Sequence, residues 1–174
     1  MNSEILKINP NSIALAGDSA GGMISATVAH DVRDKGGIQP AALCLIYPWV
    51  TTSLENQQSI ESCADMFPMT FEIMEFFRNT VFPDGENVSH LWANPLHQDN
   101  LRNLPPTIIA TAGFDPIRDQ GNQFVDLLKK AEVEVTDYCF SELPHSFLIF
   151  GRISKAAQKA NNIIAQDLSK ILNK

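Results

Sequence analysis

Two segments of the chain are apolar nearly throughout, and they limit the possible fold more than any other feature. They are AALCLIYPW at 41–49 and TIIATAG at 107–113. Uninterrupted apolar runs of this length indicate strands covered on both faces, as in parallel sheets flanked by helices. Two weaker strand patterns, SIALAG at 12–17 and VEVTDYCF at 133–140, complete a set of four, and the last is expected nearer an edge.

A helical pattern follows three of these strands. The first has apolar residues at a spacing of four and ends at DKGG, 34–37. The second and third have apolar inner faces, and the third is a long amphipathic helix from 153 to 171. The apolar positions of the three helices are Ile24, Val28 and Val32; Phe124, Leu127, Leu128 and Ala131; and Ile153, Ala156, Ala157, Ala160, Ile164, Leu168 and Ile171. This alternation predicts an α/β fold with a mostly parallel sheet and helices on both faces.

The segment 51–92 is too long for a simple crossover between strands. It contains a helical pattern, TFEIMEFFRNTVF at 70–82, after Pro68. We predict one domain over 1–174, with 51–92 forming a cap-like insertion above the sheet, because 174 residues fit a single domain comfortably.

Composition narrows the set of partners. The net charge of −7 argues against nucleic acid or an anionic membrane surface as a partner. The first twenty residues lack a signal-peptide pattern, and no apolar run approaches the roughly 20 residues of a membrane span. We therefore expect a cytoplasmic protein. Cys44, Cys63 and Cys139 are widely spaced and are expected to be buried and reduced, and no residue cluster suggests a metal or cofactor.

The sequence GDSAGG at 17–22 contains a Gly-x-Ser-x-Gly pattern between a predicted strand and a predicted helix. In that context the glycines permit a strained turn, and Ser19 lies at the carboxyl end of the strand, where open α/β sheets place ligands. We predict that Ser19 is a nucleophile. The alternative is a solvated serine in an ordinary strand-to-helix turn.

A serine nucleophile needs a base close to it in space. Of the four histidines, His145 in ELPHSF follows the last predicted strand, on the same edge of the sheet as Ser19. We predict that His145 is this base, the alternative being a loop histidine without a catalytic role. His30 is expected at the surface or core edge, and His90 and His97 have no evident partner in the sequence.

The acid that orients the base is predicted at Asp115, in AGFDPIRDQG. Pro116 fixes the turn there, so that Asp115 lies just beyond the strand and accepts the Nδ1 proton of His145. Asp119 falls in the first turn of the next helix and is interpreted as an N-terminal helix charge. The chain order Ser, Asp, His is that of the α/β-hydrolases.

Four segments together resemble the hormone-sensitive-lipase-like branch of the α/β-hydrolases, which includes bacterial carboxylesterases. They are GDSAGG, IYPWV at 46–50, GFDPIRD at 113–119 and HSF at 145–147. The chain resembles the C-terminal half of such a protein, from its fifth strand onward. The resemblance implies a partial α/β-hydrolase fold with the equivalents of strands 5–8 and the triad Ser19, Asp115 and His145. Ser146 departs from the pattern, because the family usually has glycine there.

The resemblance also implies residues around the substrate. The backbone N–H of Ala20 would belong to the oxyanion hole. The insertion would form part of the pocket wall, although packing of its side chains onto the domain is an equally good interpretation. The expected substrate contacts are Asp18, Met66, Phe67, Phe71 and Phe147, with further apolar lining from Met69, Met74, Phe76 and Phe77.

Family members carry an H-G-G-G-type oxyanion loop before the nucleophile, and this sequence has none. The strand at 12–17 would then lie at an open sheet edge, so we expect either a fragment of a longer protein or a homo-oligomer that closes the edge. The predicted function is serine-dependent hydrolysis of small, short-chain carboxylic esters, impaired in this chain by the missing loop. The alternative is a non-catalytic module for binding or oligomerisation.

Overall fold

The computed structural model describes residues 3–54, 57–83 and 91–173. Its four strands form one parallel sheet in the order β1-β2-β3-β4. The strands are β1 (Ala14–Asp18), β2 (Ala42–Ile46), β3 (Thr107–Phe114) and β4 (Val135–Pro144). The predicted α/β class and parallel sheet are therefore confirmed, with β4 at one edge and β1 at the other.

Helices connect the strands and follow the last one. The α-helices are α1 (Ser3–Leu6), α2 (Ala20–Asp34), α3 (Gln58–Ser62), α4 (Phe71–Val81), α5 (Arg118–Lys130) and α6 (Lys155–Leu172). Short 3₁₀ helices are η1 (Pro10–Ser12), η3 (Leu91–Ala93), η4 (Pro95–His97) and η5 (Phe147–Arg152). Thr70 caps α4 by accepting a hydrogen bond from the N–H of Ile73, which explains why this predicted helix begins where it does.

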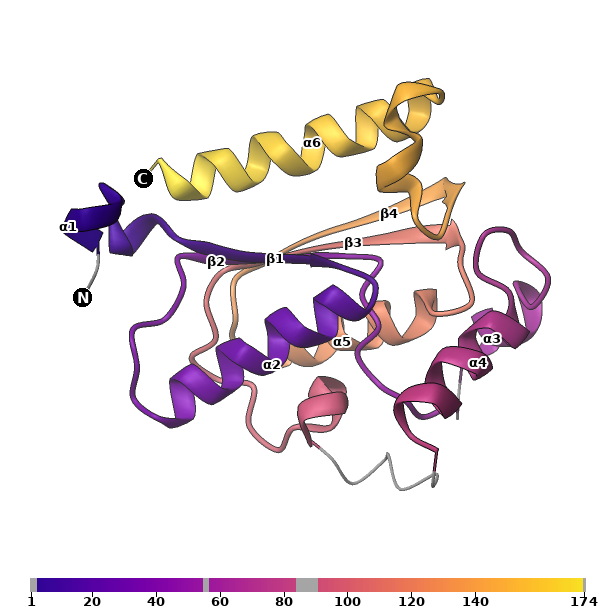
Figure 1. The fold of residues 1–174 in the computed structure, drawn as a ribbon, viewed down its shortest axis with the longest axis horizontal. Helices are drawn as coiled ribbons and strands as arrows, with labels where there is room; N and C mark the ends of the chain where they lie inside the picture. The colour runs from indigo at the N-terminus through magenta and orange to yellow at the C-terminus, as the bar shows by residue number, and fades with distance from the viewer. Residues whose placement is uncertain (1–2, 55–56, 84–90, 174) are drawn as a thin grey trace.

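Helices cover both faces of the sheet (Figure 1). α2 and α5 lie against one face, and α6 lies against the other. Side chains alternate between the two faces along each strand. In β2, for example, Leu43 and Leu45 pack toward α2 and α5, whereas Cys44 and Ile46 pack in the cluster that includes α6.

The buried face of α2 differs from the predicted one. Ile24 is 63% exposed and Val28 is 39% exposed, while the smaller Ala26 and Ala29 are fully buried. The reason is the position of α2 beside β1, the edge strand. The helix presents small residues to the sheet and its branched residues away from it.

Several smaller expectations about burial are wrong, since Leu127 on α5 and Ala156 on α6, predicted on the inner faces of their helices, are exposed. Cys139 is exposed, because it lies on β4 with its side chain on the face opposite Tyr138 and Phe140, which pack against the α6 cluster. Ile153 is 84% exposed, because α6 begins only at Lys155 and Ile153 follows η5. Cys44 and Cys63 are buried, and all three thiols are free.

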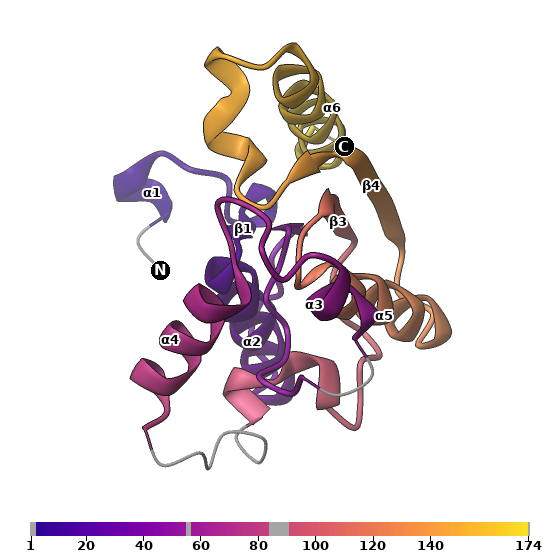
Figure 2. The same cartoon turned by 90° about the vertical axis from the view of Figure 1, so that its right-hand side faces the viewer.

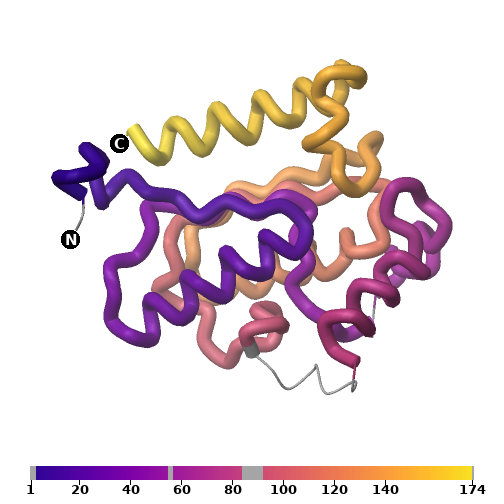
Figure 3. Tube along the Cα trace, in the orientation of Figure 1, coloured from indigo at the N-terminus to yellow at the C-terminus, as the bar shows by residue number. Residues whose placement is uncertain are grey.

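The helices of the segment after β2 gather at one end of the sheet. Figure 2 shows α3 near the start of α5, with α4 in front of α2. In the Cα trace, α1 and the end of α6 lie toward the amino ends of the strands, opposite α3 and α4 (Figure 3). The carboxyl ends of the strands therefore share their side of the molecule with α3 and α4.

Candidate active site

Ser19 lies in the turn between β1 and α2 in a rare backbone conformation. Its φ is 51° and its ψ is −121°, a region that costs a non-glycine residue about 1–3 kcal/mol. Three backbone hydrogen bonds hold it there. The N–H of Ser19 donates to Ile46 O at 2.9 Å, and the Ser19 carbonyl accepts from Trp49 N at 3.0 Å and Gly22 N at 2.9 Å.

The glycines around Ser19 are required by close backbone contacts. A Cβ on Gly17 would lie 2.1 Å from the carbonyl oxygen of Gly21, and a Cβ on Gly22 would lie 2.6 Å from Pro48 Cβ. The turn can therefore close only with glycine at both positions. These contacts explain the first glycine of the Gly-x-Ser-x-Gly pattern and the glycine directly after the pattern, whereas a Cβ on Gly21, the second glycine of the pattern, would meet only Asp18 Oδ1 at 3.9 Å.

The structure brings the three predicted triad side chains into one hydrogen-bonded chain. His145 Nε2 lies 3.1 Å from Ser19 Oγ, and His145 Nδ1 lies 2.7 Å from Asp115 Oδ2. A carboxylate can only accept a hydrogen bond, so Nδ1 of His145 carries a proton. In the neutral imidazole, Nε2 then faces Ser19 as an acceptor.

The acid and the base are both removed from solvent. Asp115 is 0% exposed and His145 is 1% exposed. The second oxygen of Asp115, Oδ1, accepts the N–H of Ile117 at 2.9 Å, which fixes the carboxylate plane. Ser146, after the histidine, has a φ of 61°. That left-handed conformation favours glycine. Glycine, which the resembling family usually has at this position, would therefore be less strained here than Ser146.

Tyr47 is a site residue that the sequence reasoning missed. Its ring lies 4.7 Å from the His145 ring, and its hydroxyl donates to Asp18 Oδ2 at 3.3 Å. Burial raises the pKa of Tyr47 well above its ordinary value, and the nearby Asp18 carboxylate raises it further. Tyr47 thus stays protonated and forms a fixed wall for the imidazole. The position of the IYPWV segment directly after a strand was the signal that could have revealed it.

Ala20 is the first residue of α2 and is exposed. Backbone N–H groups in the first turn of a helix have no acceptor within the helix, so this N–H is available next to Ser19. The exposed Asp18 lies on the other side of the nucleophile. Both predicted positions are therefore adjacent to Ser19 and reachable from solvent.

The apolar residues predicted to meet substrate fall into two groups. Met66 and Phe67 are exposed, at 38% and 78%. Phe76 and Phe77 on α4 are exposed as well, whereas Met69 and Met74 are buried in a cluster against which Phe71 packs. The insertion therefore both packs onto the domain and presents apolar side chains to solvent.

Phe147 is placed differently from its prediction as a substrate contact. It is 0% exposed, and its ring packs edge-on against Tyr47 at 4.9 Å and Phe140 at 5.4 Å. Phe147 supports Tyr47 from within the core and offers no surface to a substrate in this structure.

Two of the remaining histidines depart from expectation. His30 is buried, with 2% of its surface exposed, and is neither a surface nor a core-edge residue. His97 has a partner, since its Nε2 lies 3.0 Å from Thr51 Oγ1. His90 lies outside the described residues.

Two features that other functions would require are absent from the described parts of the chain. Residues 3–54, 57–83 and 91–173 contain no group of three or more His, Cys, Asp and Glu side chains placed to hold a metal ion. None of the helices in these ranges is long and apolar enough to cross a membrane.

Comparisons with known proteins identify the fold family of the chain. Residues 2–149 match the model of a family described as having an alpha/beta hydrolase fold. The carboxylic ester hydrolase LipN of Mycobacterium tuberculosis is 32% identical over 162 residues, covering 90% of this chain and 43% of LipN. The esterase LipI of the same organism is 35% identical over 155 residues, covering 86% of this chain and 47% of LipI.

Solved esterases share the fold. A hyperthermophilic esterase from Pyrobaculum calidifontis superposes with a TM-score of 0.90 and 30% identity, covering 99% of this chain and 56% of that one. A thermostable esterase from Pseudomonas putida gives a TM-score of 0.91 and 26% identity, covering 98% and 54%. The chain thus spans about half the length of the proteins it matches, and the predicted resemblance to half of such an esterase is confirmed. Its fold, and the match over most of its length, show that this chain belongs to the α/β-hydrolase family.

Proposed function

We propose that this chain carries the catalytic triad of a carboxylic ester hydrolase, with Ser19 as nucleophile, His145 as base and Asp115 as acid. The observation that carries the proposal is the continuous contact from Ser19 Oγ to His145 at 3.1 Å and from His145 to Asp115 at 2.7 Å. The esterases among the relatives support hydrolysis of carboxylic esters as the reaction class.

The proposed reaction has two halves. In the first, His145 Nε2 takes the Ser19 hydroxyl proton as Oγ bonds to the ester carbonyl carbon. The tetrahedral intermediate collapses, the C–O bond to the alcohol breaks, and the alcohol leaves with the proton from His145. In the second, His145 takes a proton from water as the water oxygen bonds to the acyl carbon, the bond from that carbon to Ser19 Oγ breaks, Ser19 Oγ recovers the proton from His145, and the acid is released. Asp115 stabilises the imidazolium formed in each half.

The oxyanion would be held by the N–H of Ala20 at the start of α2. The α/β-hydrolase oxyanion hole uses a further donor from an H-G-G-G-type loop, and the 174-residue sequence contains no such run. Loss of one oxyanion donor costs roughly 10²–10³ in kcat. Because each half of the reaction passes through an oxyanion, we propose that this chain both acylates Ser19 and hydrolyses esters slowly.

The proposed substrate is a small ester with a short acyl chain. Support comes from the apolar side chains that the segment 51–92 presents to solvent at Met66 and Phe67, on the side of the molecule where the strands end. We propose that this cap-like insertion, with Phe71 and Asp18, walls the acyl site.

Labelling and turnover together test the function. A fluorophosphonate probe should label the wild-type chain at Ser19, and 4-nitrophenyl acetate or butyrate should be hydrolysed. Ser19→Ala should abolish both, whereas Ser62→Ala, which changes an exposed serine on α3, should leave both unchanged. An unlabelled wild-type chain, or labelling that survives in Ser19→Ala, would contradict the proposal.

A second candidate, a non-catalytic module that self-associates, is favoured by one observation. The edge strand β1 adjoins a groove of about 320 Å³ lined by apolar side chains that include Leu6, Ile13 and Val28. An unpaired strand beside an apolar surface is a pairing site for another chain. This candidate predicts a dimer in analytical ultracentrifugation that Val28→Lys disrupts, together with no probe labelling. A labelled monomer would reject it.

A further inference from the structure

The loop that carries Asp115 is held from outside by α3. Ser59 on α3 is 0% exposed. Its hydroxyl donates to Pro116 O at 2.8 Å and accepts the N–H of Asp119 at 3.1 Å. Its backbone N–H donates to Asp119 Oδ2 at 2.8 Å. Three hydrogen bonds therefore join one serine to the two residues that bracket the turn after Asp115.

The second carboxylate oxygen of Asp119 connects these hydrogen bonds, through Arg118, to the backbone that precedes Asp115. Asp119 Oδ1 accepts from Arg118 Nε at 3.1 Å, and Arg118 Nη1 donates to Gly113 O at 2.9 Å. Gly113 lies before Asp115 and Pro116 directly after it. The side chains of Ser59, Asp119 and Arg118 thus fix the backbone on both sides of the proposed catalytic acid without touching its carboxylate.

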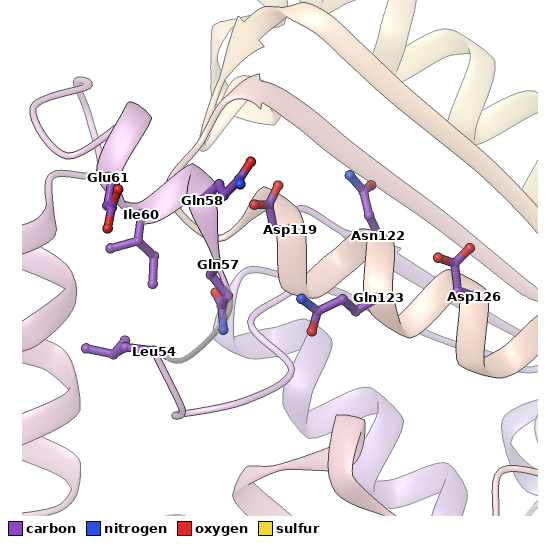
Figure 4. Close-up of a pocket in the computed structure, with 9 residues that line it drawn as sticks. All are labelled: Leu54, Gln57, Gln58, Ile60, Glu61, Asp119, Asn122, Gln123 and Asp126. Atoms are coloured by element: carbon purple, nitrogen blue, oxygen red, sulfur yellow. The ribbon is translucent and has the colours of Figure 1, made fainter.

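Contacts between α3 and α5 are concentrated at this point. A polar groove of about 750 Å³ separates their facing sides beyond it (Figure 4). Further links nearby are the hydrogen bond from Gln120 Nε2 to Gln57 Oε1 at 3.3 Å, the contact from Cys63 Sγ to Gly113 O at 3.8 Å, and the apolar cluster that contains Ile60 and Ile117. Among these links, Ser59 and Asp119 form the buried hydrogen-bonded contact that reaches the backbone directly after Asp115.

We infer that Ser59 and Asp119 are positioning residues for the reaction, which hold Asp115 in register with His145 and couple the insertion to the triad. This inference rests on the proposed function. It adds to the interpretation of Asp119 as a helix N-terminal charge, because a helix charge alone needs no buried serine partner. A buried hydroxyl with both a donor and an acceptor partner is costly to disturb.

Removing the Ser59 hydroxyl should reduce, but not abolish, the contribution of Asp115 to the reaction rate. Complete loss of the correct carboxylate in a Ser-His-Asp triad lowers kcat about 10⁴-fold. If Asp115 is held less firmly, only part of this roughly 10⁴-fold contribution should be lost. Ser59→Ala should therefore slow fluorophosphonate labelling of Ser19 about 10- to 100-fold. The concentration of probe giving half-maximal rate should stay unchanged, because neither residue contacts the ligand site.

A second readout does not depend on catalysis. The proton shared by His145 Nδ1 and Asp115 Oδ2 at 2.7 Å should give a downfield ¹H NMR resonance in the wild-type chain. Ser59→Ala should weaken or shift this resonance. Ser62→Ala, in the same helix, is the matched control and should leave both the resonance and the labelling rate unchanged.

Asp119→Asn changes the other residue of the Ser59–Asp119 contact and keeps the shape of the side chain. It provides the same test if Ser59→Ala fails to fold. If the two residues act through one contact, the double variant should be slowed no more than the slower single variant. Folded single variants with wild-type labelling and a wild-type resonance would overturn the inference. If the wild-type chain is not labelled, the proposed function fails, and the resonance alone then decides whether Ser59 positions Asp115.

Discussion

His30 should make the stability of this protein depend on pH in the mildly acidic range. It lies on α2 and is 2% exposed. Neither ring nitrogen has a hydrogen-bond partner among the residues that the structure describes. Burial, together with a smaller effect of the nearby charge of Arg33, lowers the pKa of His30 from 6.5 to about 4, although the carboxylate of Asp34 opposes this shift.

The folded protein loses stability as the pH falls because the unfolded chain binds a proton at His30 more readily than the folded chain does. Below pH 6.5 the unfolded chain protonates His30, whereas the folded chain resists protonation down to about pH 4. Stability is therefore fully present above the unfolded pKa and is lost as the pH falls toward 4. At about 1.4 kcal/mol per pKa unit, the whole shift corresponds to about 3 kcal/mol, of which about 2 kcal/mol is lost between pH 7 and pH 5.

The variant that isolates this effect is His30→Leu, which has a similar volume and no titrating group. Urea unfolding of both proteins at pH 7 and pH 5 measures it. With a slope of about 2 kcal/mol per M, the wild-type midpoint should fall between the two pH values by about 1 M more than the midpoint of the variant. At pH 7 the variant should be as stable as wild type or more stable, because a buried unpaired polar group is removed.

A different outcome would refute the reasoning in a specific way. If His30→Leu and wild type lose the same stability between pH 7 and pH 5, then His30 does not resist protonation in the fold. If the variant is less stable than wild type at pH 7 by more than about 1 kcal/mol, the imidazole has a favourable partner and is not an unpaired buried group.

Two further predictions follow from close contacts and from thiol burial. Gly17→Ala should destabilise the fold by about 3 kcal/mol or more, since its Cβ would meet Gly21 O at 2.1 Å. A Cβ on Gly21 would meet only Asp18 Oδ1 at 3.9 Å, so Gly21→Ala should be neutral or stabilising by up to about 1 kcal/mol. Thermal unfolding of both variants measures this, and equal losses of stability would contradict it. In a thiol titration of the native protein, Cys139 should react fast, while burial raises the pKa of Cys44 to about 11 and keeps it slow. Fast reaction of more than one thiol would show that the native core opens readily.

The sheet could be predicted because its signals are local. Uninterrupted apolar runs at β2 and β3 require cover on both faces, and this alone indicates a parallel sheet with helices on each side. The triad followed from the same logic, since residues just beyond the carboxyl ends of parallel strands meet at one edge. Ser19, Asp115 and His145 lie beyond β1, β3 and β4 respectively.

The errors concern which side of an element a residue faces. The apolar spacing of Ile24 and Val28 did not reveal that α2 lies beside an edge strand and packs through Ala26 and Ala29. The burial of His30 and the exposure of Cys139 have the same origin, because both depend on neighbours distant in the sequence. Phe147 was predicted to contact substrate because it lies two residues after His145 in the HSF segment. Its ring instead packs against Tyr47, a contact that the local sequence does not reveal.

Two of the motifs that looked separate in the sequence form one physical unit. The strained turn at Ser19 is stabilised by hydrogen bonds to Ile46 and Trp49, which lie in the IYPWV segment. Pro48 of that segment packs where a side chain on Gly22 would lie, and Tyr47 contacts both Asp18 and His145. The segment after β2 therefore contributes none of the three proposed triad residues, yet it holds both the proposed nucleophile and the proposed base in place. β1, β2, β3 and β4 are consecutive neighbours in one sheet, so these contacts bring together segments that follow the carboxyl ends of adjacent strands.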